Sequence, residues 1–157
     1  MKKIPLTQGR FTIIDDEDFE EVNKYKWYVS NEYVARMLLP ANRRVQISLH
    51  RILMNPPPNL QVDHINGDTL DNRRKNLRVV TLRENVINQK LHKNNTSGYK
   101  GVSWDKKLEK WETSINPNGK KIRVGFFNSL LEAVEAYNKS AIKYFGEYAR
   151  LNTTERL

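Results

Sequence analysis

Hydrophobic and polar positions alternate in several short stretches of the first third of the chain. β-Branched and aromatic side chains, which favour strands, concentrate in residues 11–14, 26–29, 33–36 and 44–49. After the first of these stretches, an acidic run precedes Phe19, Val22 and Tyr25, which are spaced like one face of a helix. This part of the chain therefore predicts short strands around one small helix.

A different pattern follows the next proline-rich break. A short apolar strand is predicted at residues 61–65, a polar loop comes after it, and a second strand is predicted at residues 76–80. Thr81 and Glu84 have the spacing of a capping box, in which the two side chains bind backbone amides at a helix start. We expect this helix to run to about His92, which gives a strand–loop–strand–helix unit.

The last third of the chain begins with a polar stretch, residues 94–98, which is the best candidate for a linker. Three further strands are predicted, at residues 101–104, 110–115 and 121–126. Asn118 and Gly119 separate the last two strands and are typical of a type I′ hairpin turn.

A long helix is predicted after these strands. Ser129 and Glu132 have capping-box spacing, and Gly146 is placed to end the helix. Its apolar face comprises Leu130, Ala133, Val134, Tyr137, Ala141, Tyr144 and Phe145. The pattern therefore predicts a three-stranded sheet with one helix laid across it.

Composition narrows the class of protein. The 157 residues carry a formal net charge of +9, which favours polyanionic partners but does not by itself separate nucleic acid from a membrane surface. The apolar runs are too short to span a bilayer, and the N-terminus has no signal-peptide core. The absence of cysteine excludes disulfides and thiolate zinc sites, and it fits a reducing cytosol.

Candidate chemistry lies in the strand–loop–strand–helix unit. Asp63 and His64 are neighbours on a predicted strand and should point to opposite faces, so they can serve different partners. An imidazole suits a general base near neutral pH, and the oxygens of Asp63 and Asn85 suit a hard ion such as Mg²⁺ or Mn²⁺. Hydrolysis of a phosphodiester needs both functions. Taken singly, each residue also fits a structural or surface role.

Residues 62–68, together with Asn72-Arg73-Arg74, Asn76-Leu77-Arg78 and Glu84-Asn85, resemble the HNH nuclease family, in particular its phage and intron-borne branch. The resemblance implies that Asp63 and Asn85 bind the metal ion and that His64 is the base. It also implies that Asn76 braces the loop and orients His64. Asp and Asn stand where the zinc-binding branch has His ligands, which disfavours zinc.

Three arginines near this unit are candidate DNA contacts. Arg51 follows His50 at a position typical of the family, where it is expected to hold a phosphate. Alternatively, the pair begins a short helix. Arg73 and Arg74 lie in the polar loop and are expected to contact the DNA backbone.

The C-terminal region carries a second set of motif residues, at positions 97–104, 110–111, 125–127, 132–137 and 141–152. These residues make up most of the region and resemble the plant APETALA/ethylene-response-factor (ERF) DNA-binding domain. That family lays a three-stranded sheet in the major groove, which is wide enough to admit a β-ribbon. The candidate DNA contacts, in which basic and aromatic residues interleave on one sheet face, are Lys100, Trp104, Lys106, Lys107, Lys110, Trp111, Lys120, Lys121 and Arg123. Alternatively, the aromatics form the core and the lysines are merely solvated. Ser103 stands where the plant family has an arginine, so base readout from that position is not expected.

The sequence thus predicts an α+β protein with a nuclease domain at residues 1–93, a ββα-metal core at about 61–92, a linker at 94–98 and an ERF-like domain at 99–157. The expected function is metal-dependent cleavage of double-stranded DNA by a free-standing homing-type enzyme of a phage or bacterium. It would act in the bacterial cytoplasm, with no membrane and no obligate protein partner. The alternative is a sequence-specific DNA-binding regulator that keeps the HNH fold as a scaffold. A protein that binds RNA or a membrane surface is favoured only by the net charge.

Overall fold

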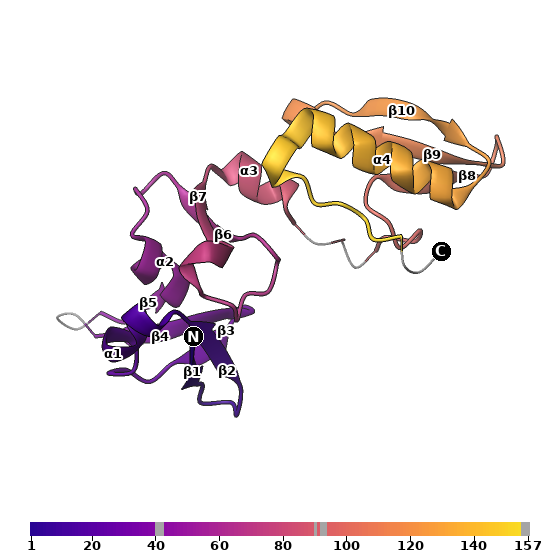
Figure 1. The fold of residues 1–157 in the computed structure, drawn as a ribbon. Coiled ribbons are helices and arrows are strands. Elements are labelled where there is room, and N and C mark those ends of the chain that lie inside the picture. Colours follow the sequence, from indigo (N-terminus) through magenta and orange to yellow (C-terminus); the bar gives the residue numbers. More distant parts are fainter. Residues whose placement is uncertain (40–42, 90, 92–93, 155–157) are drawn as a thin grey trace. The chain divides into compact units, whose positions relative to one another are not determined.

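The structure, a computed structural model, describes residues 1–39, 43–89, 91 and 94–154. The chain divides into two compact units, Met1–Val86 and Ile87–Leu157, which we describe separately (Figure 1). Each unit has its own hydrophobic core. Small antiparallel sheets combine with separate helices, so the predicted α+β class is confirmed. Within the described part of the chain, the helices are too short or too polar to cross a bilayer.

The first unit contains three small antiparallel sheets, ordered β1-β2, β3-β4-β5 and β6-β7. The strands are β1 (Lys2–Pro5), β2 (Phe11–Ile14), β3 (Tyr28–Ser30), β4 (Tyr33–Leu38), β5 (Val45–Ser48), β6 (Gln61–His64) and β7 (Leu77–Val80). The helices are η1 (Asp16–Asp18), α1 (Phe19–Val22), α2 (Leu49–Met54), η2 (Arg74–Asn76) and α3 (Leu82–Ile87), of which η denotes a 3-10 helix.

The core of the first unit draws on the N-terminal strands, the middle sheet and α2. Ile4, Ile14, Trp27 and Leu49 expose 1% of their surface or less. The indole nitrogen of Trp27 donates to the carbonyl of Val22 at 2.8 Å, so this buried polar group is satisfied. Full burial of an aliphatic or aromatic side chain stabilises the fold by about 1.5–3 kcal/mol. This core holds together the strands on which the candidate site is built.

Strand β2 also fixes the loop between β6 and β7. The backbone N–H of Ile13 donates to the carbonyl of Leu70 at 2.9 Å, and the N–H of Asn72 donates to the carbonyl of Ile13 at 2.8 Å. Ile13 and Asp71 form an isolated parallel bridge at this point. The N-terminal hairpin therefore holds a segment nearly sixty residues away in the sequence, and that segment leads directly into β7.

The predicted ββα unit is present. β6 and β7 pair in antiparallel register, with Asp63 opposite Arg78. The N-terminal capping box of α3 is confirmed, because the Glu84 carboxylate accepts from the Thr81 N–H at 2.7 Å and the Thr81 hydroxyl accepts from the Glu84 N–H at 3.3 Å.

Helix α3 is shorter than predicted, because it ends at Ile87. Ile87 and the residues after it belong to the second unit, in which the ammonium of Lys100 binds the carbonyls of Ile87 and Gln89 and Arg150 binds the carbonyl of Asn88. In a longer helix, backbone N–H groups of the next turn would donate to these carbonyls. Here the side chains of Lys100 and Arg150 donate to them instead. His92, where the helix was expected to end, lies outside the described residues.

The second unit is a three-stranded antiparallel sheet in the order β10-β9-β8, with one long helix along one face (Figure 1). Its elements are β8 (Val102–Asp105), β9 (Lys110–Ile115), η3 (Pro117–Gly119), β10 (Ile122–Phe127), α4 (Leu130–Phe145) and η4 (Gly146–Tyr148). Gly101 packs directly on the ring of Tyr137, where a Cβ atom would lie 2.3 Å from ring carbons. Its φ of +71° adds a second reason for glycine at this position.

The turn and the caps of the second unit follow the sequence signals. Asn118 and Gly119 have φ values of 62° and 76°, and the N–H of Lys120 donates to the carbonyl of Pro117 at 3.2 Å, as in a type I′ turn. Ser129 and Glu132 form the expected capping box. The segment predicted as a linker makes hydrogen bonds within this unit, including one of 2.6 Å from the Ser97 hydroxyl to the carbonyl of Val102. The domain boundary itself stays a prediction.

Two aromatic positions were wrongly expected to pack on a helix face. Tyr25 is 45% exposed because α1 ends at Val22, before the helical spacing reaches it. Tyr144 is also 45% exposed. By the 100° step per residue, Tyr144 lies only 20° from Tyr137 and so in line with the buried stripe of α4, but it falls in the last turn of the helix, which ends at Phe145.

Candidate active site and DNA-binding face

Asp63 and His64 are adjacent on β6 and contact different groups, as strand geometry requires. Both are buried, with 7% and 3% of their surface exposed. The Oδ2 atom of Asp63 accepts from Nε and Nη2 of Arg78 at 3.0 and 2.8 Å. His64 instead turns its ring toward a cluster of side chains on the other side of the strand.

Asn72 binds the ring of His64. The Oδ1 atom of Asn72 lies 3.3 Å from Nε2 of His64, and Asn72 is fully buried. Its Nδ2 atom donates to the hydroxyl of Thr12 at 2.9 Å and to the carbonyl of Thr69 at 3.2 Å. Burial lowers the pKa of His64, whereas the Asn72 bond and the nearby carboxylates act in the opposite direction. With this lowered pKa, the ring is mainly neutral at neutral pH.

Two further rings lie against His64. The His50 ring centroid is 5.2 Å away, and that of Tyr33 is 6.0 Å away. Burial lowers the pKa of His50 to about 3, and His64 and Arg51 add to the shift, so His50 is neutral at neutral pH. Sequence reasoning placed the pair His50-Arg51 at a position typical of the family or at the start of a short helix, without a role for the His50 ring, and the pair does lie in α2. It did not single out Tyr33, which reaches the site from a hairpin with no motif of its own.

Asn76 makes its hydrogen bonds within the loop that precedes it. Its Nδ2 donates to the carbonyl of Asp71 at 2.7 Å, and its Oδ1 accepts from the N–H of Asn66 at 3.1 Å. A direct hydrogen-bond contact with the His64 ring is made by Asn72. Sequence reasoning quoted Asn72 as part of the motif but gave it no such role.

Asn85 lies on the same side of β6 as Asp63. Its Nδ2 donates to Oε1 of Gln61 at 2.6 Å, and Gln61 and Asp63 are two residues apart on one strand, so they share a face. Within the described residues, no cluster of three or more His, Cys, Asp or Glu side chains is arranged to hold a metal ion. A metal site here would depend on one carboxylate and one amide, which are both oxygen donors.

The three arginines expected at the DNA make internal hydrogen bonds. Arg51 donates to the carbonyl of Leu60 at 3.2 Å. Arg73 forms a two-bond contact with Asp71, and this contact lowers the pKa of that carboxyl.

Arg74 is held by Asp18. It donates to the two carboxylate oxygens of Asp18 at 3.0 and 2.7 Å, and to the carbonyl of Leu53 at 3.0 Å. Asp18 was expected only as part of an acidic helix start, but it is buried and it anchors the β6–β7 loop. The structure thus gives Arg73 and Arg74 bracing roles, and their DNA contacts stay predictions.

In the second unit, cross-strand register decides which side chains share a face. Trp104 lies opposite Trp111, and Val102 lies opposite Thr113. Val102 and Thr113 are buried beneath α4, so the two tryptophans, each two residues along the strand, lie on the same helix-covered side. Their rings meet edge to face at 5.0 Å between centroids. The expectation that tryptophans and basic residues interleave on one face is therefore wrong, although Trp104 is 46% exposed.

The open face of the sheet carries basic side chains around one carboxylate. Glu112 lies between Lys121 and Arg123, with nitrogen–oxygen distances of 3.0 and 3.1 Å, and these two cations lower its pKa. Lys110 is exposed at the start of β9. Three more predicted contacts are exposed in the two hairpin turns: Lys106, Lys107 and Lys120.

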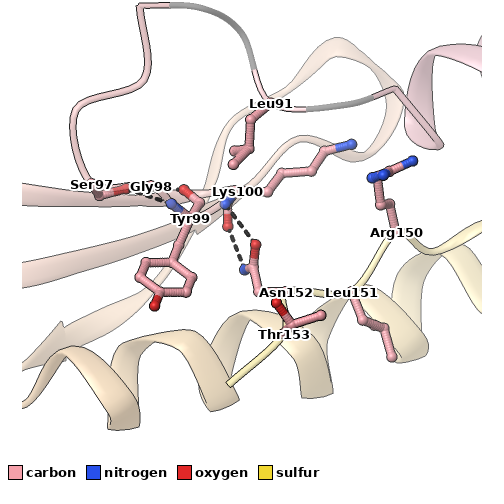
Figure 2. Close-up of a pocket in the computed structure, with 9 residues that line it drawn as sticks. All are labelled: Leu91, Ser97, Gly98, Tyr99, Lys100, Arg150, Leu151, Asn152 and Thr153. Atoms are coloured by element: carbon pink, nitrogen blue, oxygen red, sulfur yellow. Dashed lines mark hydrogen bonds between the residues drawn. The ribbon is translucent and has the colours of Figure 1, made fainter. Parts of the chain in front are cut away.

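Lys100 does not share this open face. It lines a pocket of about 520 Å³ together with Arg150, Asn152 and residues 97–99 (Figure 2). Its backbone N–H donates to Oδ1 of Asn152 at 2.7 Å, and its ammonium donates to the carbonyls described above. Burial lowers the pKa of Lys100 to about 8, and Arg150 adds to the shift. Its predicted DNA contact would have to compete with these bonds.

Comparisons with known proteins now bear on this site. A family model described as HNH endonuclease matches residues 54–87. The chain is 29% identical to an uncharacterized HNH endonuclease of Acanthamoeba polyphaga mimivirus over 154 residues, which cover 92% of this chain and 76% of that protein. It is 38% identical to Protein 3.8 of Escherichia phage T7 over 96 residues, which cover 60% of this chain and 77% of that protein. The chain belongs to the HNH endonuclease family.

The segment of this HNH endonuclease that matches the family model includes β6, the whole loop that follows it, β7 and all of α3. It contains Asp63, His64, Asn76 and Asn85. Thr12, which binds Asn72, lies outside it, as do Tyr33 and His50, so the family model alone does not reach these parts of the site. HNH endonucleases generally use a divalent metal ion.

A weaker likeness covers a smaller part of the chain. The chain is 35% identical to APETALA2-like protein 2 of rice over 57 residues, which cover 36% of this chain and 13% of the rice protein. No solved structure matches the chain.

Proposed function

We propose that this HNH endonuclease hydrolyses phosphodiester bonds of double-stranded DNA with His64 as the general base and one divalent ion held by Asp63 and Asn85. The observation that carries the proposal is the arrangement on β6. His64 lies in a buried cluster on one side of the strand. Asp63 lies on the other side, together with Gln61, to which Asn85 is hydrogen-bonded. The base and the metal ligands are thus adjacent in sequence but separated by the strand.

His64 suits proton abstraction because burial lowers its pKa and leaves the ring unprotonated at neutral pH. Asn72 holds the ring from the side of Nε2, and the rings of His50 and Tyr33 pack against it. These contacts limit the rotation of the imidazole. A neutral base that is held in one orientation is ready to accept a proton, because it seldom adopts orientations that cannot react.

The donor set of the proposed metal site fits a hard cation. Asp63 would supply a carboxylate oxygen, with Arg78 bound to its Oδ2 atom, and Asn85 would supply its amide oxygen, with its Nδ2 bound to Gln61. Oxygen ligands of this kind suit Mg²⁺ or Mn²⁺. When bound, such an ion would stabilise charge on the phosphate and on the leaving oxygen.

The second unit would supply DNA affinity. The basic open face of its sheet, the exposed lysines in the hairpin turns and the partial likeness to an APETALA2-like protein support an ERF-like mode of binding. Lys110 and Arg123 would reach phosphates from the strands, and Lys106, Lys107 and Lys120 from the turns. Lysines of this kind carry affinity through phosphate contacts and counterion release.

The relatives in phage T7 and mimivirus support a place of action on DNA inside an infected cell. A free-standing homing-type enzyme would fit this setting. The N-terminal hairpin and the ββα unit would then form the cutting module, and the remainder would direct it to DNA.

The proposal is tested by incubating the full chain with supercoiled plasmid in Mg²⁺, in Mn²⁺ and in excess chelator. We expect linear or nicked product with the ions and none with chelator. Binding is followed separately by gel shift in chelator, where the complex should still form. A chain that binds plasmid in all conditions and never cuts it would leave only the DNA-binding part of the proposal standing.

A further inference from the structure

A chain of buried hydrogen bonds leads from the N-terminal hairpin to the candidate base. Thr12 on β2 and Asn72 in the β6–β7 loop are fully buried, and His64 is 3% exposed. We propose that Thr12 and Asn72 are positioning residues, a proposal that rests on the proposed role of His64 as general base. They hold the His64 imidazole in the tautomer that carries its hydrogen on Nε2 and its lone pair on Nδ1.

The direction of these hydrogen bonds is set by Thr12, the residue of the series that lies farthest from His64. The Thr12 hydroxyl lies 2.8 Å from the carbonyl oxygen of Leu70, which accepts hydrogen bonds and cannot donate them. A hydroxyl has one hydrogen, so Thr12 donates it to Leu70. Its oxygen must then accept from the next partner, the side-chain amide of Asn72, at 2.9 Å.

The amide of Asn72 therefore faces Thr12 with its NH₂ group. The carbonyl of Thr69, 3.2 Å from the same nitrogen, is a second acceptor and requires the same orientation. If the amide were flipped, its oxygen would lie against two acceptors in a fully buried position, which is costly. Thr12 and Thr69 together thus determine which end of Asn72 faces His64.

The end that faces His64 is the amide oxygen, 3.3 Å from Nε2. An oxygen acceptor at this distance requires Nε2 to carry a hydrogen. In the neutral ring, Nδ1 then holds the lone pair and is the atom that accepts a proton. The opposite tautomer would place the Nε2 lone pair against the Asn72 oxygen.

Thr12 has a matched counterpart that separates positioning from packing. Thr113 in the second unit is also fully buried, and its hydroxyl donates to the carbonyl of Ala133 at 2.9 Å. Replacing either threonine with valine removes a buried hydroxyl of the same kind and keeps the side-chain shape. Only the replacement of Thr12 removes a determinant of the His64 tautomer.

The test combines nitrogen NMR of the histidine rings with cleavage kinetics on the full-length chain. The sequence has three histidines, and the His64 ring is assigned by its loss in His64→Gln. Protonated and unprotonated ring nitrogens resonate far apart, so the spectrum identifies the tautomer without reference to activity. The proteins compared are wild type, Thr12→Val, Thr12→Ser and Thr113→Val, each checked for folding by circular dichroism and thermal melting.

We expect wild type and Thr113→Val to show His64 with hydrogen on Nε2, and Thr12→Val to show a mixture of tautomers. For Thr12→Val we expect kcat to fall roughly tenfold at unchanged KM, equivalent to about 1.4 kcal/mol, the scale of one hydrogen bond. Thr12→Ser, which retains the hydroxyl, should restore the tautomer and kcat.

A wild-type ring protonated on Nδ1 would overturn the proposal, and this observation requires no variant to fold. A Thr12→Val protein with the wild-type tautomer and wild-type kcat would also overturn the role of Thr12. Undiminished cleavage by His64→Ala is a different failure, because it would remove the general-base assignment and with it the purpose of the hydrogen-bond chain. The ring spectrum would still decide whether that chain sets the tautomer.

Discussion

The guanidinium of Arg78 lies 2.8 Å from the carboxylate of Asp63, directly across the β6–β7 pair. Both side chains are largely buried, with 14% and 8% of their surface exposed. Arg78 therefore neutralises the carboxylate that we propose as a metal ligand. The pair is buried within the sheet, where an unpaired charge strongly destabilises the folded protein.

We predict that Arg78→Met destabilises the protein by about 3–5 kcal/mol in chelator, because it removes the guanidinium that pairs with the buried Asp63 carboxylate. If Asp63 binds the metal ion, millimolar Mg²⁺ should return a larger part of the lost stability in this variant than it adds to wild type. The measurement is urea denaturation with and without Mg²⁺.

A matched control for this prediction is Arg74→Met. Arg74 is paired with buried Asp18, away from the proposed metal ligands, so its loss should cost stability without creating a new response to Mg²⁺. An equal Mg²⁺ response in both variants would point to a general ion effect and would count against Asp63 as the ligand.

We predict that His64→Ala loses cleavage while plasmid binding in chelator stays within about twofold of wild type. Removal of a general base typically lowers the rate by about 10²–10⁴-fold. His64 is buried and faces Asn72 and two rings, so it has little surface to give to DNA affinity. Cleavage at the wild-type rate would remove His64 from the mechanism.

We predict that Asp63→Asn and Asn85→Ala each raise the Mg²⁺ concentration needed for half-maximal cleavage, by roughly tenfold or more. A hard ion held by few protein oxygens depends strongly on each of them. Asp63→Asn keeps the shape and an oxygen for Arg78, which limits the structural damage. Unchanged Mg²⁺ titrations in both variants would show that the ion is bound elsewhere.

Much of the fold was predictable because local signals agree with the final packing. The Thr81–Glu84 and Ser129–Glu132 capping boxes and the Asn118–Gly119 turn each depend on residues that are neighbours in sequence. Patterns of this kind are visible without tertiary information. The errors fall where tertiary contacts decide, as at Ile87, where α3 ends among carbonyls bound by Lys100 and Arg150.

The candidate site was predictable only in part, for a similar reason. Asp63, His64 and Asn85 lie within one short motif. Thr12 and Tyr33, by contrast, reach the site from hairpins more than twenty residues upstream, and the sequence gives no distance between a hairpin and a loop. In the same way, the sequence alone did not show on which side of the sheet Trp111 lies, because that side is determined by strand register and burial.

We predict that acid destabilises the first unit through His50. Its folded pKa of about 3 lies below the ordinary value of 6.5, so the unfolded chain binds more protons between these two pH values. Stability is therefore fully present above pH 6.5 and is lost as the pH falls toward 3, with a slope approaching about 1.4 kcal/mol per pH unit from this residue. Urea denaturation of His50→Gln between pH 7 and 4 should show a shallower pH dependence than wild type. Parallel curves would mean that His50 carries no part of the acid sensitivity.

The basic residues of the second unit lead to a prediction about salt. Lys107 lies in the β8–β9 turn and Lys110 at the start of β9, and both are exposed. Each phosphate that a protein neutralises contributes about −0.9 to the slope of log affinity against log salt. If both lysines contact phosphates, Lys107→Gln/Lys110→Gln should make the slope shallower by about 1.8.

The control variant, Lys139→Gln/Lys143→Gln, changes the net charge by the same amount. Both of its lysines are exposed on α4, the helix that covers the opposite face of the sheet. Long-range attraction depends on net charge and would weaken in both double variants alike, whereas counterion release depends on which lysines touch phosphates. Gel-shift affinities in chelator, taken over a series of salt concentrations, should therefore show a reduced slope only for the turn variant. Equal slopes in the two variants would show that the lysines of this sheet attract DNA only through the net charge, and would remove the open face as the site of contact.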